Sequence, residues 1–171
     1  MDVYFIAVQA CGFLAFGLSL VSYQFKNQRT MFAIRVCGDL IWAIHYFLLS
    51  AMTPAVTVLI ASLRTFLSVF VCPKQRAVVV GVAIISVCGI CVYYGSGDWK
   101  GYLPALTAII YGLSTYYHEN YKISRILMGA GLLVWICIGV LFQSYAEVIS
   151  SSVGLISLAL GFYRHKKSGQ V

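Results

Sequence analysis

Charged residues are scarce in this chain of 171 residues. Only 10% of the residues are Asp, Glu, Lys or Arg, whereas 61% are hydrophobic and the mean hydropathy is +0.88. A soluble globule of this size needs more polar surface than these residues supply. The composition therefore excludes a soluble enzyme, and the high hydrophobic content excludes a disordered or collagen-like chain.

The few charges that are present give a net charge of +7. This value would suit a nucleic-acid-binding protein, but the basic residues stand in short clusters between apolar runs. Membrane proteins keep such clusters in the loops on one side of the bilayer. We therefore expect a lipid bilayer around the chain and no nucleic-acid partner.

The six cysteines predict neither a disulfide framework nor a metal site. They lie in or at the ends of apolar runs, where thiols behave as small hydrophobic side chains. Cys88 and Cys91 form a C-x-x-C pair, but no second pair and no histidine lies near it, so we interpret both as packing residues. We expect no cofactor.

Seven apolar runs are long enough to cross a bilayer, because a membrane helix needs about 20 residues. No positive segment precedes the first run, so we expect it to be retained as a span. The predicted spans are Val3 to Tyr23, Met31 to Ser50, Pro54 to Val71, Ala77 to Tyr94, Tyr102 to Tyr117, Ile123 to Phe142 and Val148 to Tyr163.

The basic residues alternate between the connections. The loops after the second, fourth and sixth spans contain Lys100 as their one basic residue. Nine basic residues follow the first, third, fifth and seventh spans. Because Lys and Arg resist translocation, this pattern predicts an outside N-terminus and a cytoplasmic C-terminus, which requires an odd number of spans. The nine are Lys26, Arg29, Lys74, Arg76, Lys122, Arg125, Arg164, Lys166 and Lys167.

The chain contains an internal repeat. Leu40-Ile41-Trp42 recurs 93 residues later as Leu133-Val134-Trp135, and Gly17-Leu18-Ser19 recurs 95 residues later as Gly112-Leu113-Ser114. Spans one to three therefore match spans five to seven in the same orientation, with span four as the linker, which is a known transporter design. The predicted units are a first bundle (1–72), a linker helix (73–101), a second bundle (102–164) and a cytoplasmic tail (165–171).

Small and polar residues share one face of several spans at helical spacing. Thr57 on the third span corresponds to Ser150 on the seventh, and Gln9 and Tyr111 lie on the polar faces of the first and fifth. Two interpretations stay open. Such faces form tightly packed bundle interiors, since small residues allow helices to approach closely, or they line a polar cavity between the halves.

Two charges lie at similar depth within the predicted spans, Asp39 on the second and Arg64 on the third. An unpaired charge there would cost at least ~2.5 kcal/mol, so we expect the two to pair, with Arg35 sharing Asp39 from one helical turn away. The pair is either a structural salt bridge or a gate that anchors a ligand.

Trp42 and Trp135 occupy equivalent positions of the repeat. Two indoles facing each other across the halves would sandwich a flat or ring-shaped solute, and ordinary core packing is the alternative. We interpret His45 as a hydrogen-bonded packing residue, and Glu147 as a residue that favours the N-terminal end of the seventh helix through its dipole.

The segment His45-Tyr46-Phe47-Leu48-Leu49, followed by Arg64-Thr65, resembles the YgjV-type family of bacterial inner-membrane proteins across most of the chain. The repeat resembles the wider group of SWEET sugar transporters, PQ-loop proteins and Pnu-type vitamin transporters. That resemblance implies alternating access around a central pocket, with a Trp on the second helix of each triplet and an Asn on the third. Trp42 and Trp135 match the two Trp positions. Thr57 and Ser150 are the nearest equivalents of the Asn on the third helix of each triplet.

We therefore predict an all-helical, seven-span protein of the bacterial inner membrane with a SWEET-like parallel 3+1+3 repeat, and not an enzyme. Its expected activity is facilitated movement of a small neutral polar solute, such as a sugar, nucleoside or vitamin. Pro104 would act as a hinge, because proline removes a backbone hydrogen bond. The alternative is a non-transporting membrane protein with a dry interior. The predicted pocket residues are Trp42, Trp135, Thr57, Ser150, Gln9 and Tyr111, with Asp39, Arg64 and Arg35 as the gate.

Overall fold

The computed structural model describes residues 3–22, 28–95, 97–117 and 120–167. This part of the chain is entirely helical, as the hydropathy predicts, with seven α-helices, one short 3-10 helix and no strand. The elements are α1 (Val3–Ser22), α2 (Gln28–Leu48), α3 (Met52–Phe70), α4 (Pro73–Tyr94), η1 (Trp99–Tyr102), α5 (Leu103–Tyr116), α6 (Tyr121–Leu141) and α7 (Tyr145–Lys167).

Some helix boundaries differ from the predicted spans. Helix α7 begins at Tyr145 and continues to Lys167, so the first residues of the predicted tail 165–171 are helical. Residues 168–171 of that tail, together with Tyr23 and Lys26, lie outside the described residues. Helix α5 has only 14 residues because η1 immediately precedes it.

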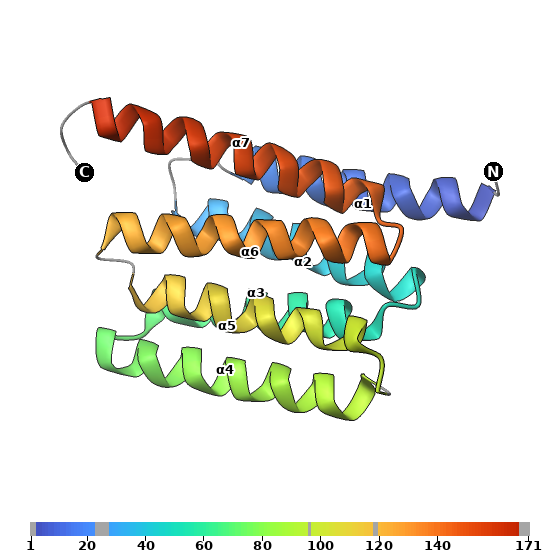
Figure 1. Ribbon diagram of the computed structural model, residues 1–171, viewed down its shortest axis with the longest axis horizontal. Coiled ribbons are helices and arrows are strands. Elements are labelled where there is room, and N and C mark those ends of the chain that lie inside the picture. The colour runs from blue at the N-terminus through green and yellow to red at the C-terminus, as the bar shows by residue number, and fades with distance from the viewer. Residues whose placement is uncertain (1–2, 23–27, 96, 118–119, 168–171) are drawn as a thin grey trace.

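The helices form two layers (Figure 1). Each helix contacts the next one along the chain, and further contacts join α1 to α7 and α3 to α5. Helices α1, α2 and α3 therefore face α7, α6 and α5, while α4 lies at the edge between α3 and α5. We call the end of the bundle where α1 begins the N end, and the end where α7 stops the C end.

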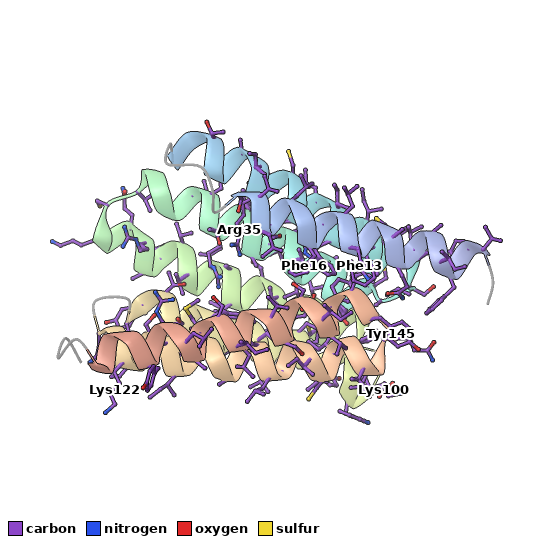
Figure 2. The ribbon with its side chains drawn as sticks, turned by 90° about the horizontal axis from the view of Figure 1, so that it is seen from above. Phe13, Phe16, Arg35, Lys100, Lys122 and Tyr145 are labelled. Carbon is purple, nitrogen blue, oxygen red and sulfur yellow. The ribbon has the colours of Figure 1, made fainter. Side chains whose placement is uncertain are left out.

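The two ends of the bundle differ in their content of basic residues. Lys74 and Arg76 lie in the first turn of α4, and Lys122 and Arg125 lie near the start of α6, all at the C end. Lys100 lies in η1 at the N end, opposite Lys122 (Figure 2). This separation has the form that the positive-inside rule produces in membrane bundles.

The two loops at the N end have the same backbone structure at an interval of 93 residues. Helices α2 and α6 both contain 21 residues, and both bounds of α6 lie 93 positions after those of α2. The loops that follow contain the only positive-φ residues other than glycine in the described chain, Ser50 (57°) and Gln143 (56°). Their backbone hydrogen bonds also recur at this interval.

In the first loop the Ala51 N–H donates to Tyr46 O at 2.9 Å, and in the second the Ser144 N–H donates to Gly139 O at 2.8 Å. These partners too are separated by 93 positions. Such bonds satisfy carbonyls that a helix end leaves free. The sequence repeat therefore coincides with a recurrence of local structure.

The outer faces of the helices are apolar and suit a lipid environment. Three helices are long and apolar enough to cross a membrane by length and composition, namely Val3–Ser22, Lys74–Tyr94 and Lys122–Leu141. The third and seventh helices contain shorter apolar segments, Met52–Leu67 and Tyr145–Leu160. Large side chains such as Ile85 and Val92 on α4 are 73% and 70% exposed, which is stable where lipid replaces water.

Candidate functional site

A stack of aromatic rings joins the two layers at the position of the predicted indole pair. The Tyr46 ring lies 6.1 Å from the Trp42 ring at an interplanar angle of 29°, and 5.8 Å from the Trp135 ring at 36°. Tyr46 is fully buried, and Trp42 is 7% exposed. The structure thus brings both predicted indoles to one cluster, bridged by a ring of the protein itself. A flat solute that stacked on both indoles would compete with Tyr46 in this conformation.

The aromatic stack lies toward the N end rather than at the centre of the helices. Trp42 lies six residues before the end of α2 at Leu48, which is about 9 Å at 1.5 Å per residue. Trp135 lies equally far from the end of α6 at Leu141. Small side chains such as Ala15, Ala51 and Ala55 complete the packing around the rings.

His45 forms a buried polar link between the first and last parts of the chain. Its Nδ1 atom lies 2.8 Å from Val8 O on α1, and its Nε2 atom lies 2.7 Å from Ser144 Oγ before α7. Both His45 and Ser144 are completely buried. Because a carbonyl oxygen accepts but never donates, Nδ1 must carry a hydrogen. In the neutral ring Nε2 is then an acceptor, and the Ser144 hydroxyl donates to it.

Gln9 joins α1 to the beginning of α7. Its Nε2 group donates to Gln143 O at 2.8 Å, and its Oε1 atom accepts from the Ala146 N–H at 3.4 Å. Gln9 is 7% exposed, and burying an amide is tolerable when both of its ends find partners. This member of the predicted pocket set therefore connects two helices in the present conformation.

Glu147 lies in the first turn of α7, within the sequence Ser144-Tyr145-Ala146-Glu147. The Ser144 hydroxyl accepts from the Glu147 N–H at 3.3 Å, as in a helix N-cap. The Glu147 carboxylate does not turn back to the loop, as a capping box would require. It accepts a hydrogen bond from Ser151 and interacts with Tyr46, and the residue is 8% exposed. Glu147 is therefore a buried carboxyl group of the bundle interior that lies in the first turn of α7.

The remaining pocket residues lie in different environments. Thr57 is 2% exposed, and its hydroxyl donates to Thr53 O at 2.7 Å on its own helix. Ser150 on α7 is half-buried. The Tyr111 ring packs on α6, where a methyl group added to Gly131 would lie 2.7 Å from the ring. Their contact with a solute stays a prediction.

Pro104 lies in the first turn of α5 and is fully buried. The N–H groups of a first turn have no partner within the helix, so a proline there removes no helical hydrogen bond. The physical basis for a loosened helix is therefore missing at this position. The predicted hinge role assumed a proline inside the helix, and the position of Pro104 in the first turn does not support that role.

The predicted gate charges have different neighbours. Asp39 interacts with Arg35, one turn away on α2, and with the hydroxyl of Ser62 on α3. Arg64 on α3 has Tyr111 of α5 as its electrostatic partner. The expected sharing of Asp39 by Arg35 thus agrees with the structure, whereas Arg64 faces the second half of the chain.

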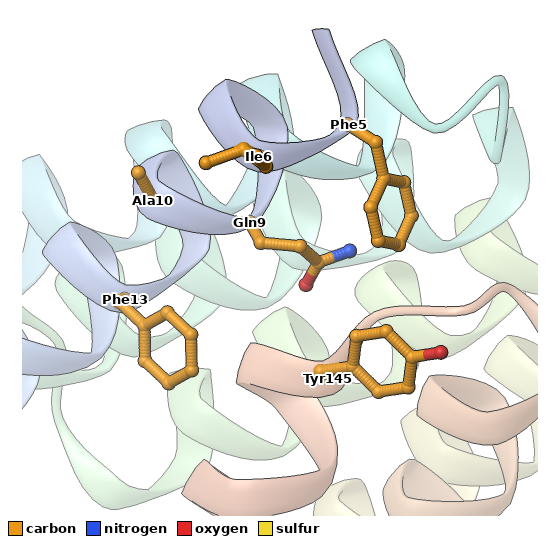
Figure 3. Close-up of a pocket in the computed structure, with 6 residues that line it drawn as sticks. All are labelled: Phe5, Ile6, Gln9, Ala10, Phe13 and Tyr145. Carbon is orange, nitrogen blue, oxygen red and sulfur yellow. The ribbon is translucent and has the colours of Figure 1, made fainter. Parts of the chain in front are cut away.

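A shallow apolar groove lies beside the polar cluster, between α1 and the start of α7 (Figure 3). Its volume is about 290 Å³, and it is open to the surroundings. Phe5 and Tyr145 meet there edge to face, with ring centroids 5.9 Å apart. The Gln9 amide and the Tyr145 side chain contribute polar groups to an otherwise apolar wall, and the lining residues are Phe5, Ile6, Gln9, Ala10, Phe13 and Tyr145.

Sequence reasoning found the two indoles and Gln9, but it missed the cluster that Tyr46, His45, Ser144 and Glu147 form. One signal was available. The S-x-x-E pattern marks the start of α7, and His45 lies at the same end of α2, so antiparallel helices would place them at one depth. Within the described residues, no group of three or more His, Cys, Asp or Glu side chains is arranged to hold a metal.

Comparison with known families gives a match over most of the chain. The model of the family Imp-YgjV, described as bacterial inner membrane protein, matches residues 6–169. No curated protein and no solved structure matches the chain.

Proposed function

We propose a transport function for this chain, which belongs to the Imp-YgjV family of bacterial inner membrane proteins. It is located in the bacterial inner membrane. The proposed activity is the movement of a small neutral polar solute, such as a sugar, nucleoside or vitamin, by alternating access between two three-helix bundles. We assign it no catalytic activity, and its partners are the solute and the lipid bilayer.

The first support for this proposal is the recurrence of structure between the two triplets. Helices α2 and α6, and the loops that follow them, match at an interval of 93 residues in length, backbone angle and hydrogen bonding. The contacts between helices agree with a two-fold relation between the triplets. Such a relation replaces α1 by α5 and α7 by α3, and contacts are present both between α1 and α7 and between α5 and α3. We infer a parallel 3+1+3 repeat, with α4 as the linker.

The second support is the polarity of the surface between the layers. Gln9, His45, Ser144 and Ser151 are all buried at the N end of that interface, and polar groups inside a membrane bundle usually mark a cavity or pathway. We interpret the present conformation as closed at the N end, with Tyr46 filling the space between the indoles. Alternating access requires the Tyr46 ring to leave that position.

The orientation belongs to the same proposal. Because the basic residues near the starts of α4 and α6 lie at the C end, we place that end in the cytoplasm and the N end outside. Tyr46 and Glu147 would then form the outer closure.

The alternative function is that of a membrane protein with a dry interior and an assembly role. The ring of Tyr46 is completely buried against Trp135, so the interface is filled by protein at that point. The two functions differ in whether this interface ever admits water.

Cysteine labelling distinguishes them. In a variant that lacks the native cysteines, Thr57→Cys and Ser150→Cys are treated with a membrane-impermeant thiol reagent in intact membranes. Gln143→Cys, in an exposed loop, is the positive control, and Leu63→Cys, on an exposed apolar face, is the negative control. The transport proposal predicts labelling at Thr57 and Ser150 above the level of Leu63. Labelling at Gln143 alone would favour the dry interior.

A further inference from the structure

Glu147 is buried in the bundle, and among the described residues no cation lies beside it. In the described part of the chain its side chain interacts with two hydroxyl groups, those of Ser151 on α7 and Tyr46 on α2. The facing part of α6 is Gly139, where an added methyl group would lie 3.2 Å from Glu147 Cβ. From α1, the Gln9 amide is already bonded to backbone groups of the loop and of α7. A buried carboxylate without a counter-charge is costly, and proton uptake removes that cost.

The hydroxyl group of Tyr46 is a buried polar group that requires a hydrogen-bond partner. It is completely buried and makes no hydrogen bond within the described residues, although Glu147 and Ser144 are its polar neighbours. A hydroxyl in such a position can both accept a proton and donate one. It therefore stands between the carboxyl of Glu147 and the hydroxyl of Ser144.

His45 lies at the other side of Ser144 and is the second titratable group of this cluster. Its Nδ1–H is committed to Val8 O, so its Nε2 atom, 2.7 Å from Ser144 Oγ, is the position where it gains or loses a proton. The neighbouring groups of Glu147, Tyr46, Ser144 and His45 can each donate or accept a proton. Chains of carboxyl and imidazole groups carry protons in membrane pumps and transporters.

We propose that these four groups form a proton-binding site with one exchangeable proton. The proton resides on the Glu147 carboxyl. When it moves, Glu147 gives its proton to the Tyr46 oxygen, Tyr46 passes its own to Ser144, and Ser144 passes its own to His45 Nε2. The products are a Glu147 carboxylate and a His45 imidazolium, so the total charge is unchanged. The site does not depend on the proposed transport function, and it supplies a coupling ion if that function holds.

Infrared spectroscopy of the purified full-length protein in lipid tests the site directly. The proposal predicts a carbonyl band of a protonated carboxylic acid at neutral pH, which disappears in Glu147→Gln and persists in the matched control Asp39→Asn. It also predicts that Tyr46→Phe, which keeps the ring but removes the neighbouring hydroxyl, keeps the band and shifts the pH at which it is lost. A band that persists in Glu147→Gln and disappears in Asp39→Asn would overturn the proposal, as would a Tyr46→Phe titration identical to that of the wild type.

A sodium ion is the competing occupant, since carboxyl and hydroxyl oxygens also bind hard cations. Thermal unfolding in sodium chloride and in choline chloride at equal ionic strength separates the two. The proton site predicts equal melting temperatures in both salts. Stabilisation by sodium chloride alone, lost in Glu147→Gln, would contradict the proton site. Neither measurement requires a solute, so failure here is distinguishable from failure of the transport proposal.

Discussion

Tyr46 on α2 and Trp135 on α6 are in direct ring contact, with their centroids 5.8 Å apart, and they connect the two layers of helices. Tyr46 also stacks on Trp42 of its own helix. The two indoles are therefore joined through a third ring. This arrangement fills the interface at the N end. Under the proposed transport function, movement of Tyr46 would decide whether a solute can reach the indoles.

Substitution of Tyr46 separates the contribution of its ring from that of its hydroxyl. Tyr46→Ala removes a completely buried ring and is expected to reduce the free energy of unfolding by about 3–5 kcal/mol. Tyr46→Phe keeps the ring and is expected to change the free energy of unfolding by less than about 1 kcal/mol, because the hydroxyl makes no hydrogen bond within the described residues. Chemical denaturation in detergent measures both. Equal losses in the two variants would contradict this account of the stack.

Gly12 and Gly17 provide a matched pair on α1. A methyl group at Gly12 would lie 2.7 Å from Ala146 Cβ and 2.9 Å from His45 Cε1, whereas one at Gly17 meets no atom within 4 Å. We predict that Gly12→Ala destabilises the protein by about 1–3 kcal/mol, because α1 must move away from α7. Gly17→Ala is expected to be neutral, or stabilising by up to about 1 kcal/mol. Melting temperatures of the two variants, compared with that of the wild type, test this difference in sign.

Ser144→Ala tests the buried link to His45. It removes the hydroxyl bonded to His45 Nε2 and the cap of the Glu147 N–H, so we predict a loss of about 1–3 kcal/mol of stability. The loop backbone should tolerate alanine, because Ala51 holds the equivalent position in the first loop. Ser152→Ala, on a half-buried part of α7, is the control. A loss no larger than that of the control in denaturant unfolding would show that the link contributes little.

Because the two loops at the N end have similar backbone structure, we expect the same substitution to change the stability of the protein equally in both. Ser50 and Gln143 have φ values of 57° and 56°, a region that glycine adopts without the cost paid by other residues. Ser50→Gly and Gln143→Gly are each expected to raise stability by about 0.5–1 kcal/mol. Thermal unfolding of the single variants and the double variant checks this. Opposite effects at the two sites would count against equivalent loops.

Much of the fold was predictable because it depends on local sequence. Long apolar runs determine where helices form in a membrane, and the short loops around Ser50 and Gln143 allow only antiparallel neighbours. The recurrence of Trp42 as Trp135 predicted equivalent positions near the middle of two spans, whereas the structure places each indole only six residues before the end of its helix. The helix ends were less predictable, since α7 begins at Tyr145, three residues before the predicted span Val148 to Tyr163, and continues to Lys167.

The candidate site was less predictable because it depends on contacts between distant residues. Nothing near Tyr46 in the sequence indicates that its ring meets Trp135, and nothing near His45 indicates a bond to Ser144. Depth alone suggested that Asp39 and Arg64 would pair. In the structure Arg35 and Ser62 are the polar neighbours of Asp39, and Tyr111 is the electrostatic partner of Arg64. Side-chain direction within a bundle follows from packing of the whole chain, which periodicity does not describe.

The distance between the two layers at each end tests alternating access most directly. Spin labels at Ser50 and Gln143 report on the N end, and labels at Cys72, which follows α3, and Lys122, which lies at the start of α6, report on the C end. In lipid nanodiscs, double electron–electron resonance is expected to show a short and a long distance for each pair of labels. Conditions that favour the long distance at one end should favour the short distance at the other end. A single narrow distance at both ends under all conditions would contradict the account.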